Sequence, residues 1–137
     1  MVKMSKVIAV DFTDEEIRIL KNLLESKDKE VYSVNKNFHT VWFQSESSDA
    51  ELRIAFLSNV QLTISRVCVS HKHQGIMTAM LKELIQICKE KDIHKIVMQS
   101  VLTPECAAFC KKNGFVPNPS TTFEMNNIVM GDYILSI

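Results

Sequence analysis

Apolar side chains recur every three or four positions over residues 76–91, and this pattern predicts a long amphipathic helix. Lysine and glutamate fill many of the intervening positions, so the opposite side of the helix is expected to face water. The predicted buried stripe consists of Met77, Met80, Leu81, Leu84, Ile87 and Cys88.

Two further helices are predicted from the signals at their ends. A helix over about 13–26 begins with Thr13 and Glu16 at the spacing of a capping box, in which each side chain binds a free backbone N–H at the helix start. A shorter helix follows a threonine cap, with Pro104 at its first position, where a missing N–H costs nothing. Gly114 marks the end of that helix, because glycine readily takes the left-handed backbone conformation found there.

Short apolar runs bounded by turn-forming residues predict the strands. Turn signals join the runs at 40–43, 52–57 and 62–69, so these three are expected to form an antiparallel meander. The polar segment 27–37 shows no clear periodicity and gives no prediction. The predicted strands span residues 6–12, 40–43, 52–57, 62–69, 94–101, 123–125 and 133–137.

The composition narrows the class of protein. A chain of 137 residues with 46% hydrophobic and 23% charged residues suits a single globular domain over 1–137. A formal net charge of zero argues against a general nucleic-acid binder, which needs clustered positive charge. The sequence has no apolar stretch of about 18 residues and no secretion-signal pattern, so we expect a cytoplasmic protein without a membrane partner.

The four cysteines, Cys68, Cys88, Cys106 and Cys110, contain no Cys-x-x-Cys pair. We therefore expect reduced thiols, mostly buried, rather than a zinc site or a disulfide framework. The run His71-Lys72-His73 is interpreted as positive charge for an anion rather than as a pair of metal ligands, and no metal is expected.

The start of the strongest predicted helix has the features of an anion site. Gly75 stands where the preceding strand leads into the helix, and the loop over 70–75 carries one lysine and two histidines. Backbone N–H groups in the first turn of a helix lack partners and point outward, so they bind anions such as phosphate. An ordinary strand–turn–helix connection is the alternative for a lone glycine, and the surrounding segment is what favours a phosphate site.

Two segments resemble motifs of the GNAT superfamily of N-acetyltransferases. Residues 66–81 are similar to motif A, in which a strand ends in a loop of the form Arg/Gln-x-x-Gly-x-Gly/Ala and a helix follows. Residues 107–115 are similar to a later motif of the family, which has a tyrosine and a Gly-Phe pair at this spacing. Residues 84–96 follow the family without a gap, whereas the first sixty residues resemble it only in the order of elements.

The resemblance implies an α/β (α+β) fold of GNAT type, with a mixed, mostly antiparallel central sheet and helices on both faces. Acetyl-CoA would be the acetyl donor and would lie in a V between the strand that ends at Val69 and the strand at 96–101. Strand backbone would pair with its pantetheine arm, and the N–H groups of 73–78 would bind its pyrophosphate. The residues implied in cofactor binding are Val67, Cys68, Val69, Lys72, His73, Gln74, Gly75, Ile76, Met77, Thr78 and Phe109.

The chain departs from the family pattern at two positions. Met77 stands where the second glycine of the loop is usual, and Cys110 stands where the tyrosine is usual. The resemblance gives position 110 the role of the general acid that protonates the leaving thiolate, so Cys110 is the implied catalytic residue. A thiol can donate a proton, but a small buried residue in place of a phenol is the other interpretation.

A general base is not evident. The chain has no carboxylate between Glu51 and Glu83, so the strand predicted over 62–69 carries none. Glu51, His39 and Ser65 are candidates by position, and water relayed through backbone carbonyls is a further one.

The sequence leads to two hypotheses for function. The first is an acetyl-CoA-dependent N-acetyltransferase that acts on a primary amine of a small molecule or peptide. The second is a degenerate GNAT-fold module that binds acyl-CoA or a protein partner without turnover. Gly75 and the basic loop favour the first, whereas Met77 and Cys110 favour the second. The sequence leaves open the acceptor and whether the chain forms a homodimer.

Overall fold

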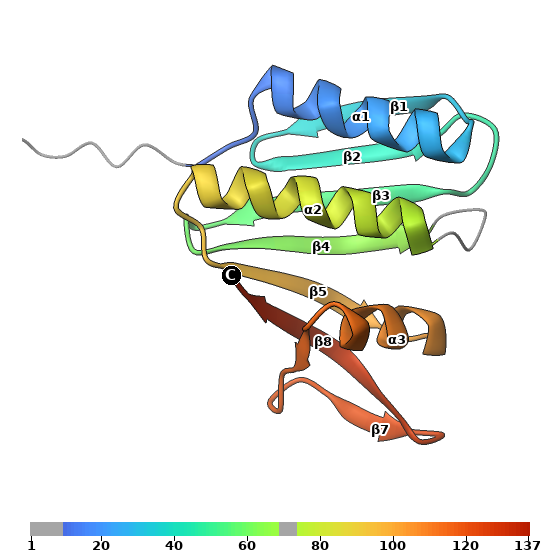
Figure 1. Cartoon of the computed structure of the whole chain (residues 1–137), viewed down its shortest axis with the longest axis vertical. Coiled ribbons are helices and arrows are strands. Elements are labelled where there is room, and N and C mark those ends of the chain that lie inside the picture. The colour runs from blue at the N-terminus through green and yellow to red at the C-terminus, as the bar shows by residue number, and fades with distance from the viewer. Residues whose placement is uncertain (1–9, 69–73) are drawn as a thin grey trace, which may run out of the picture.

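The computed structural model of the protein describes residues 10–68 and 74–137 (Figure 1). The strand predicted over 6–12 lies partly outside these residues, and its described part, which begins at Val10, is a loop. The backbone N–H of Val10 donates a hydrogen bond of 2.7 Å to the Asn59 side chain. The strand prediction is therefore wrong for the described part of this run, where a side chain supplies a hydrogen bond that a neighbouring strand would otherwise supply.

Helix α1 (Asp14–Asp28) begins as predicted. The Thr13 side chain accepts a hydrogen bond from the backbone N–H of Glu16, and the Glu16 side chain accepts one from the backbone N–H of Thr13. These two bonds satisfy donors that the start of a helix otherwise leaves without partners. Leu20 and Leu24 are fully buried on the inner side of α1.

Four strands follow α1 as an antiparallel meander: β1 (Tyr32–Asn37), β2 (Thr40–Ser45), β3 (Glu51–Leu57) and β4 (Gln61–Cys68). The meander predicted for the last three is confirmed, with small differences at the strand ends. Strand β1 lies in the segment that gave no prediction. It is the edge of the sheet and most of its side chains are exposed, so it lacks the alternation of apolar and polar residues that marks a half-buried strand.

The second half of the chain alternates helices with strands. Helix α2 (Gln74–Glu90) leads to β5 (Lys95–Val101), and α3 (Pro104–Lys112) follows β5. Gly114 has a φ of +88° just past α3, as predicted for the end of this helix. The last three strands are β6 (Val116–Pro117), β7 (Phe123–Met125) and β8 (Ile128–Ser136).

One mixed sheet connects the strands in the order β1-β2-β3-β4-β5-β8-β6, and β7 pairs with β8. Within the described residues, only β4 and β5 pair in parallel, and the other pairs are antiparallel. These findings confirm the predicted α/β class with a mixed, mostly antiparallel sheet. Strand β6 was missed because two residues are too few to show a periodicity.

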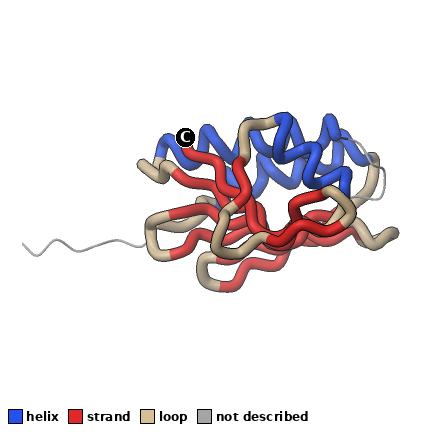
Figure 2. Tube along the Cα trace, turned by 90° about the horizontal axis from the view of Figure 1, so that it is seen from below, coloured by secondary structure: helices blue, strands red, loops and turns tan. Residues whose placement is uncertain are grey.

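All three helices of the described chain lie on one face of the sheet (Figures 1 and 2). Their buried side chains form one cluster with the inward-facing side chains of the strands. The expectation of helices on both faces is therefore wrong. Buried positions alternate with partly exposed ones in β2 and β3, and the partly exposed positions include Trp42, Glu51 and Arg53. Only one face of these strands is thus apolar enough to hold a helix, and we call the uncovered face the open face.

Candidate active site

Strands β4 and β5 pair only at their beginnings. The last register pair between them is Ile64 opposite Met98. Strand β4 then continues to Cys68 and β5 to Val101, with no further pair between them in the described residues. Figure 1 shows the two strands diverging toward the C-terminal end of β4. The edges of both strands therefore become available for another hydrogen-bonding group beyond this pair.

A bulge lies in β4 directly after the last parallel pair. Ile64 of β4 pairs with Ile54 of β3, whereas Arg66 pairs with Arg53. Ser65 is therefore an extra residue in β4. A bulge bends its strand and increases the local twist, which turns β4 away from its previous course.

A second bulge lies in β5 at the same level. Two residues between Met98 and Val101 of β5 face the single residue Asp132 of β8. One of them, Ser100, has a φ of 56°, and its backbone N–H donates a 2.9 Å hydrogen bond to the Asp132 carboxylate. Because both bulges follow the last parallel pair, the parting of β4 from β5 is built into both strands.

The predicted cofactor-binding residues of β4 lie at this opening. Val67 and Cys68 are at the end of β4, where they pair with β3 on one edge. Their other edge faces the side from which β5 has departed. The predicted residues Val69, Lys72 and His73 lie outside the described part of the chain.

The next predicted residues form the first turn of α2. Gln74 and Gly75 are its first two residues. Ile76 and Met77 are buried, at 2% and 6% exposure, whereas Thr78 is exposed. The free N–H groups of a first helical turn carry partial positive charge, which attracts anions, and the first turn of α2 is close in sequence to the end of β4.

Met77 packs in the hydrophobic core. It belongs to the same buried cluster as Met80, Leu81 and Leu84, which are the neighbours predicted from helical spacing. A side chain that lies in the core does not itself cover the N–H groups of the first turn. The methionine in place of the family's glycine is therefore compatible with an anion at the start of α2.

The predicted residues of α3 are also buried. Phe109 is 5% exposed and Cys110 is fully buried. A hydrogen bond with Cys106, reinforced by burial, raises the pKa of the Cys110 thiol far above its ordinary value. Burial raises the pKa of Cys88 to about 12, and Cys88, Cys106 and Cys110 are free thiols. A thiol without solvent contact and with a raised pKa is badly placed to protonate a leaving group, so burial favours a packing role for Cys110.

Four side chains on the open face form a connected polar cluster beside the β4 bulge. The Trp42 Nε1–H donates a 2.9 Å hydrogen bond to Glu51 Oε1. The Arg53 Cζ atom lies over the Trp42 ring, 5.5 Å from its centroid. The Arg53 Nε–H donates a 3.0 Å hydrogen bond to the hydroxyl of Ser65, the bulge residue itself. All four residues are partly exposed.

Sequence reasoning named Glu51 and Ser65 in this cluster but missed Trp42 and Arg53. The register of β2 with β3 pairs Trp42 directly with Arg53, which brings the ring and the guanidinium onto the same face. The available signal was the turn between the two strands, because the turn sets the register of a hairpin. The turn type was not evident from the residues alone.

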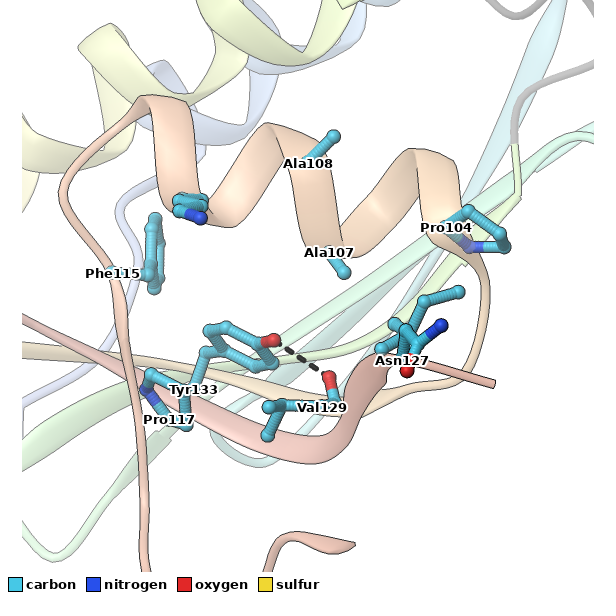
Figure 3. Close-up of a pocket in the computed structure, with 10 residues that line it drawn as sticks. Pro104, Ala107, Ala108, Phe115, Pro117, Asn127, Val129 and Tyr133 are labelled. Carbon is cyan, nitrogen blue, oxygen red and sulfur yellow. Dashed lines mark hydrogen bonds between the residues drawn. The ribbon is translucent and has the colours of Figure 1, made fainter. Parts of the chain in front are cut away.

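A separate cavity of about 340 Å³ lies between α3 and β8 (Figure 3). Ala107 and Lys111 of α3 and Val129 and Tyr133 of β8 contribute to its walls. The Tyr133 hydroxyl donates a 2.6 Å hydrogen bond to the Val129 carbonyl, and burial raises the pKa of this phenol. None of the predicted cofactor-binding residues lines this cavity, so it is distinct from the opening between β4 and β5.

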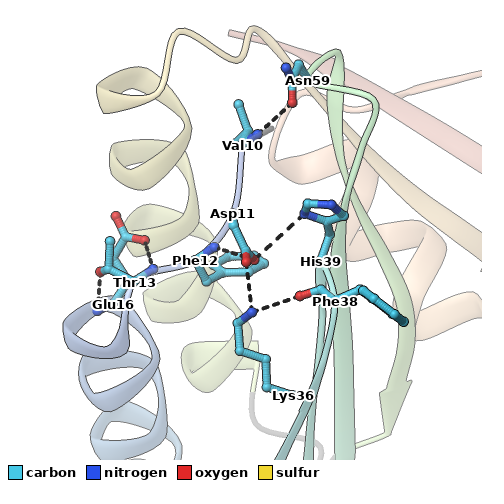
Figure 4. Close-up of polar contacts among 9 residues, drawn as sticks. All are labelled: Val10, Asp11, Phe12, Thr13, Glu16, Lys36, Phe38, His39 and Asn59. Carbon is cyan, nitrogen blue, oxygen red and sulfur yellow. Dashed lines mark hydrogen bonds and ion pairs between the residues drawn. The ribbon is translucent and has the colours of Figure 1, made fainter. Parts of the chain in front are cut away.

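His39, another candidate base, lies at the opposite end of β2 from Glu51. Strand β2 begins directly after His39, whereas Glu51 pairs near its other end. His39 Nδ1 is 4.0 Å from Asp11 Oδ1, and Lys36 Nζ is 2.8 Å from Asp11 Oδ2 (Figure 4). Burial alone would raise the pKa of Asp11, but hydrogen bonds from Lys36 and the neighbouring backbone hold it below its ordinary value. This cluster is therefore remote from the opening beside β4.

Two kinds of feature are absent from residues 10–68 and 74–137. No group of three or more His, Cys, Asp or Glu side chains there could hold a metal ion. No helix there is long and apolar enough to cross a membrane.

Solved structures match this arrangement over most of the chain. Ard1 from Thermoplasma volcanium is 14% identical with a TM-score of 0.52, over 95% of this chain and 97% of that one. A probable acetyltransferase from Staphylococcus epidermidis ATCC 12228 is 14% identical with a TM-score of 0.52, over 88% and 76%. A probable GNAT-family acetyltransferase from Chromobacterium violaceum ATCC 12472 is 13% identical with a TM-score of 0.50, over 86% and 79%.

The chain has the GNAT fold. The GNAT resemblance of the two sequence motifs is thereby confirmed at the level of the fold. At these identities the likeness establishes the GNAT fold and not a particular activity. No protein-family model matches the sequence, and no curated protein matches it either.

Proposed function

We propose that the protein is an acetyl-CoA-dependent N-acetyltransferase that acetylates a primary amine of a small molecule or peptide. The observation that carries this proposal is the parting of β4 and β5 after Ile64 and Met98, close to the first turn of α2. In a GNAT fold, free strand edges next to a helix N-terminus suit an extended thioester cofactor with phosphate groups at one end.

The cofactor would bind through backbone groups more than through side chains. The pantetheine arm carries amide groups, and Val67, Cys68 and Val69 would pair with them along the edge of β4 that β5 has left. The pyrophosphate would lie against residues 72–78, which include a lysine, a histidine and the first turn of α2. Phe109 is 5% exposed, so only a small part of its ring could touch the cofactor.

The acceptor amine would approach from the open face, because the helices cover the other face. We assign the role of general base to Glu51. It lies on β3 opposite Cys68 at the end of β4, and the Trp42 Nε1–H holds its carboxylate with a 2.9 Å hydrogen bond. A primary amine is mostly protonated at neutral pH, so the carboxylate takes a proton from the nitrogen before it attacks the thioester carbonyl.

The attack forms an N–C bond, and breakdown of the resulting intermediate breaks the C–S bond. CoA then leaves as a thiolate that takes up a proton. The family resemblance names Cys110 as the donor of this proton, but that thiol is fully buried. We therefore infer that water at the opening, rather than Cys110, donates the proton.

A second candidate function is a GNAT-fold module that binds acyl-CoA or a protein partner without turnover. Cys110 favours this candidate, because a thiol without solvent contact stands where the family motif has a tyrosine. Met77 does not favour it, because its side chain lies in the core and not over the first turn of α2.

The two candidates differ in a pair of measurements on the purified chain. Acetyl-CoA at about 100 times its Kd should stabilise the folded protein by about 2.7 kcal/mol, which is visible as a rise in Tm. Thiol release from acetyl-CoA should then accelerate when amines from a broad panel are added. A rise in Tm without amine-dependent thiol release would favour the binding module, and the absence of both would overturn the proposal.

A further inference from the structure

Arg53 is held on the open face by contacts that use only part of its guanidinium group. Its Nε–H donates to Ser65 Oγ at 3.0 Å, and its Cζ lies 5.5 Å from the centroid of the Trp42 ring. Within the described residues, neither Nη group makes a hydrogen bond and no carboxylate forms an ion pair with Arg53. The two outer nitrogens therefore offer a fixed pair of donors, which is the geometry that binds a carboxylate through two parallel hydrogen bonds.

The position of Arg53 connects this donor pair to the proposed reaction. Its partner Ser65 is the bulge residue at which β4 leaves β5, so the guanidinium lies beside the point where the acetyl group would be delivered. Glu51, the proposed base, lies two residues earlier on the same strand. Alternate residues of a strand point to the same face and are about 7 Å apart. The open face therefore presents the Arg53 guanidinium and the Glu51 carboxylate side by side.

Trp42 links the two charges. Its Nε1–H donates a hydrogen bond to Glu51, and the Arg53 guanidinium lies over its ring. One rigid aromatic side chain therefore positions both groups. A ligand with a positive and a negative group close together would match this pair, because each of its charges would meet the opposite charge.

We propose that the acceptor is a free amino acid, whose carboxylate binds the outer nitrogens of Arg53 while its amine lies at Glu51. This inference rests on the proposed N-acetyltransferase function and names the substrate class of that site. A peptide N-terminus lacks a carboxylate next to its amine. A phosphate group would bring two negative charges close to the Glu51 carboxylate, so a carboxylate fits better beside it.

The first test compares each common amino acid with the amine that remains after its carboxylate is removed, using thiol release from acetyl-CoA. At least one amino acid should have a kcat/KM roughly tenfold or more above that of its decarboxylated amine. Arg53→Met should lower kcat/KM for that amino acid roughly tenfold to hundredfold, mainly through KM, and should lower it far less for the decarboxylated amine, so that the preference for the amino acid is lost. Arg53→Lys should recover part of the loss.

The matched control is Arg18→Met, which removes the same charge from the exposed side of α1, where Arg18 pairs with Glu15. This variant should leave kcat/KM unchanged both for the amino acid and for its decarboxylated amine. Phosphoethanolamine and ethanolamine form a further pair. A stronger preference for the phosphorylated amine than for any amino acid would overturn the assignment of a carboxylate.

The second test does not need turnover, because Trp42 is the single tryptophan of the chain. N-acetylated amino acids, added in the presence of CoA, should change the tryptophan fluorescence of the wild type and not that of Arg53→Met. Circular dichroism and Tm confirm that the variant is folded. The N-acetyl derivatives of the decarboxylated amines should cause little change at the same concentrations.

The outcomes separate this inference from the proposed function. If amines are acetylated but amino acids are no better than their decarboxylated amines, the inference is wrong and the acetyltransferase stands. If acetyl-CoA neither binds nor reacts, the proposed function fails. In that case an Arg53-dependent fluorescence response to amino acids still supports the anion site, and its absence overturns that site as well.

Discussion

The two faces of the β2–β3 hairpin differ in how their side chains are held, although residues of the same two strands build both. Toward the helices, Phe43 and Ile54 are fully buried and held by close packing. On the open face, Trp42 and Arg53 remain partly exposed and are held by directional contacts with Glu51 and with the β4 bulge. Burial on one face supplies stability, which leaves the other face free to hold polar groups, and we propose that these groups meet a ligand.

This comparison can be tested because neighbouring residues of one strand should affect different measurements. Substitutions toward the helices should change the free energy of unfolding, and substitutions on the open face should change turnover. Substitutions at the proposed cofactor site, at the start of α2, should change the affinity for CoA and neither of these two quantities.

The largest effect is expected at the start of α2. Gly75→Asp adds a negative charge and a side chain where the pyrophosphate would lie, so it should abolish CoA binding. Acetyl-CoA would then no longer raise Tm, and calorimetry would detect no binding. Asn22→Asp adds the same charge on an exposed position of α1 and should keep the full shift. An unchanged Kd in Gly75→Asp would mean that the phosphate lies elsewhere.

On the open face, Glu51→Gln should lower kcat about 10²–10⁴-fold, because the amide cannot take a proton from the acceptor amine. The Kd for acetyl-CoA should stay the same, since the cofactor would contact backbone groups of β4. The control is Glu46→Gln, an exposed carboxylate in the turn after β2. A rate close to that of the wild type would remove Glu51 from the mechanism.

On the helix-covered face, Ile54→Ala should lower the free energy of unfolding by about 2–5 kcal/mol, because it leaves a cavity in a fully buried site. Arg53→Met, one residue away on the open face, should lower it by only about 1–2 kcal/mol, through loss of the contacts with Trp42 and Ser65. Urea denaturation measures both values. Similar losses for the two variants would contradict the division between the faces.

Cys110→Ala should lower the free energy of unfolding by about 1–2 kcal/mol and leave kcat nearly unchanged, because the thiol is fully buried beside Cys106. Cys106→Ala removes the other partner of the same hydrogen bond and serves as the comparison. A large fall in kcat for Cys110→Ala alone, with normal CoA affinity, would instead restore the role that the family resemblance gives to position 110.

The smallest effect is expected at Asp11, whose lowered pKa reflects its contacts with Lys36. A carboxylate with a lowered pKa in the folded state adds stability above its unfolded pKa of 3.8, and this stability is lost as the pH falls through the folded pKa. Asp11→Asn should therefore lower the free energy of unfolding by less than about 1 kcal/mol at pH 7, because the ion pair with Lys36 is partly exposed and screened by solvent. The difference from the wild type should vanish in acid; a difference that is the same at every pH would show that charge is not its cause.

Several parts of this structure could be predicted because they depend on nearby residues. The capping box of Thr13 and Glu16 and the left-handed Gly114 involve contacts within one turn of a helix. The buried stripe of α2, which includes Met80 and Leu84, follows from the helical repeat. The two motifs, which are also local segments of the chain, predicted the GNAT fold.

The parts that could not be predicted depend on residues far apart in the chain. Strand β1 exists because β2 pairs with it, and its exposed side chains carry no pattern of their own. The bulge at Ser65 requires the register between β3 and β4, and the burial of Cys110 requires the packing of α3 on the sheet. The choice of one face for all the helices likewise depends on the assembled sheet.

The sequence by itself determined the three helices of the described chain, the caps at Thr13 and Gly114 and, through its motifs, the type of fold, because these follow from residue spacing along the chain. Only the tertiary structure decided that Trp42 would contact both Arg53 and Glu51, and that β4 and β5 would diverge next to them. The physical reason is that strand register and bulges bring together residues from different strands, and no local pattern encodes which side chains will then share a face.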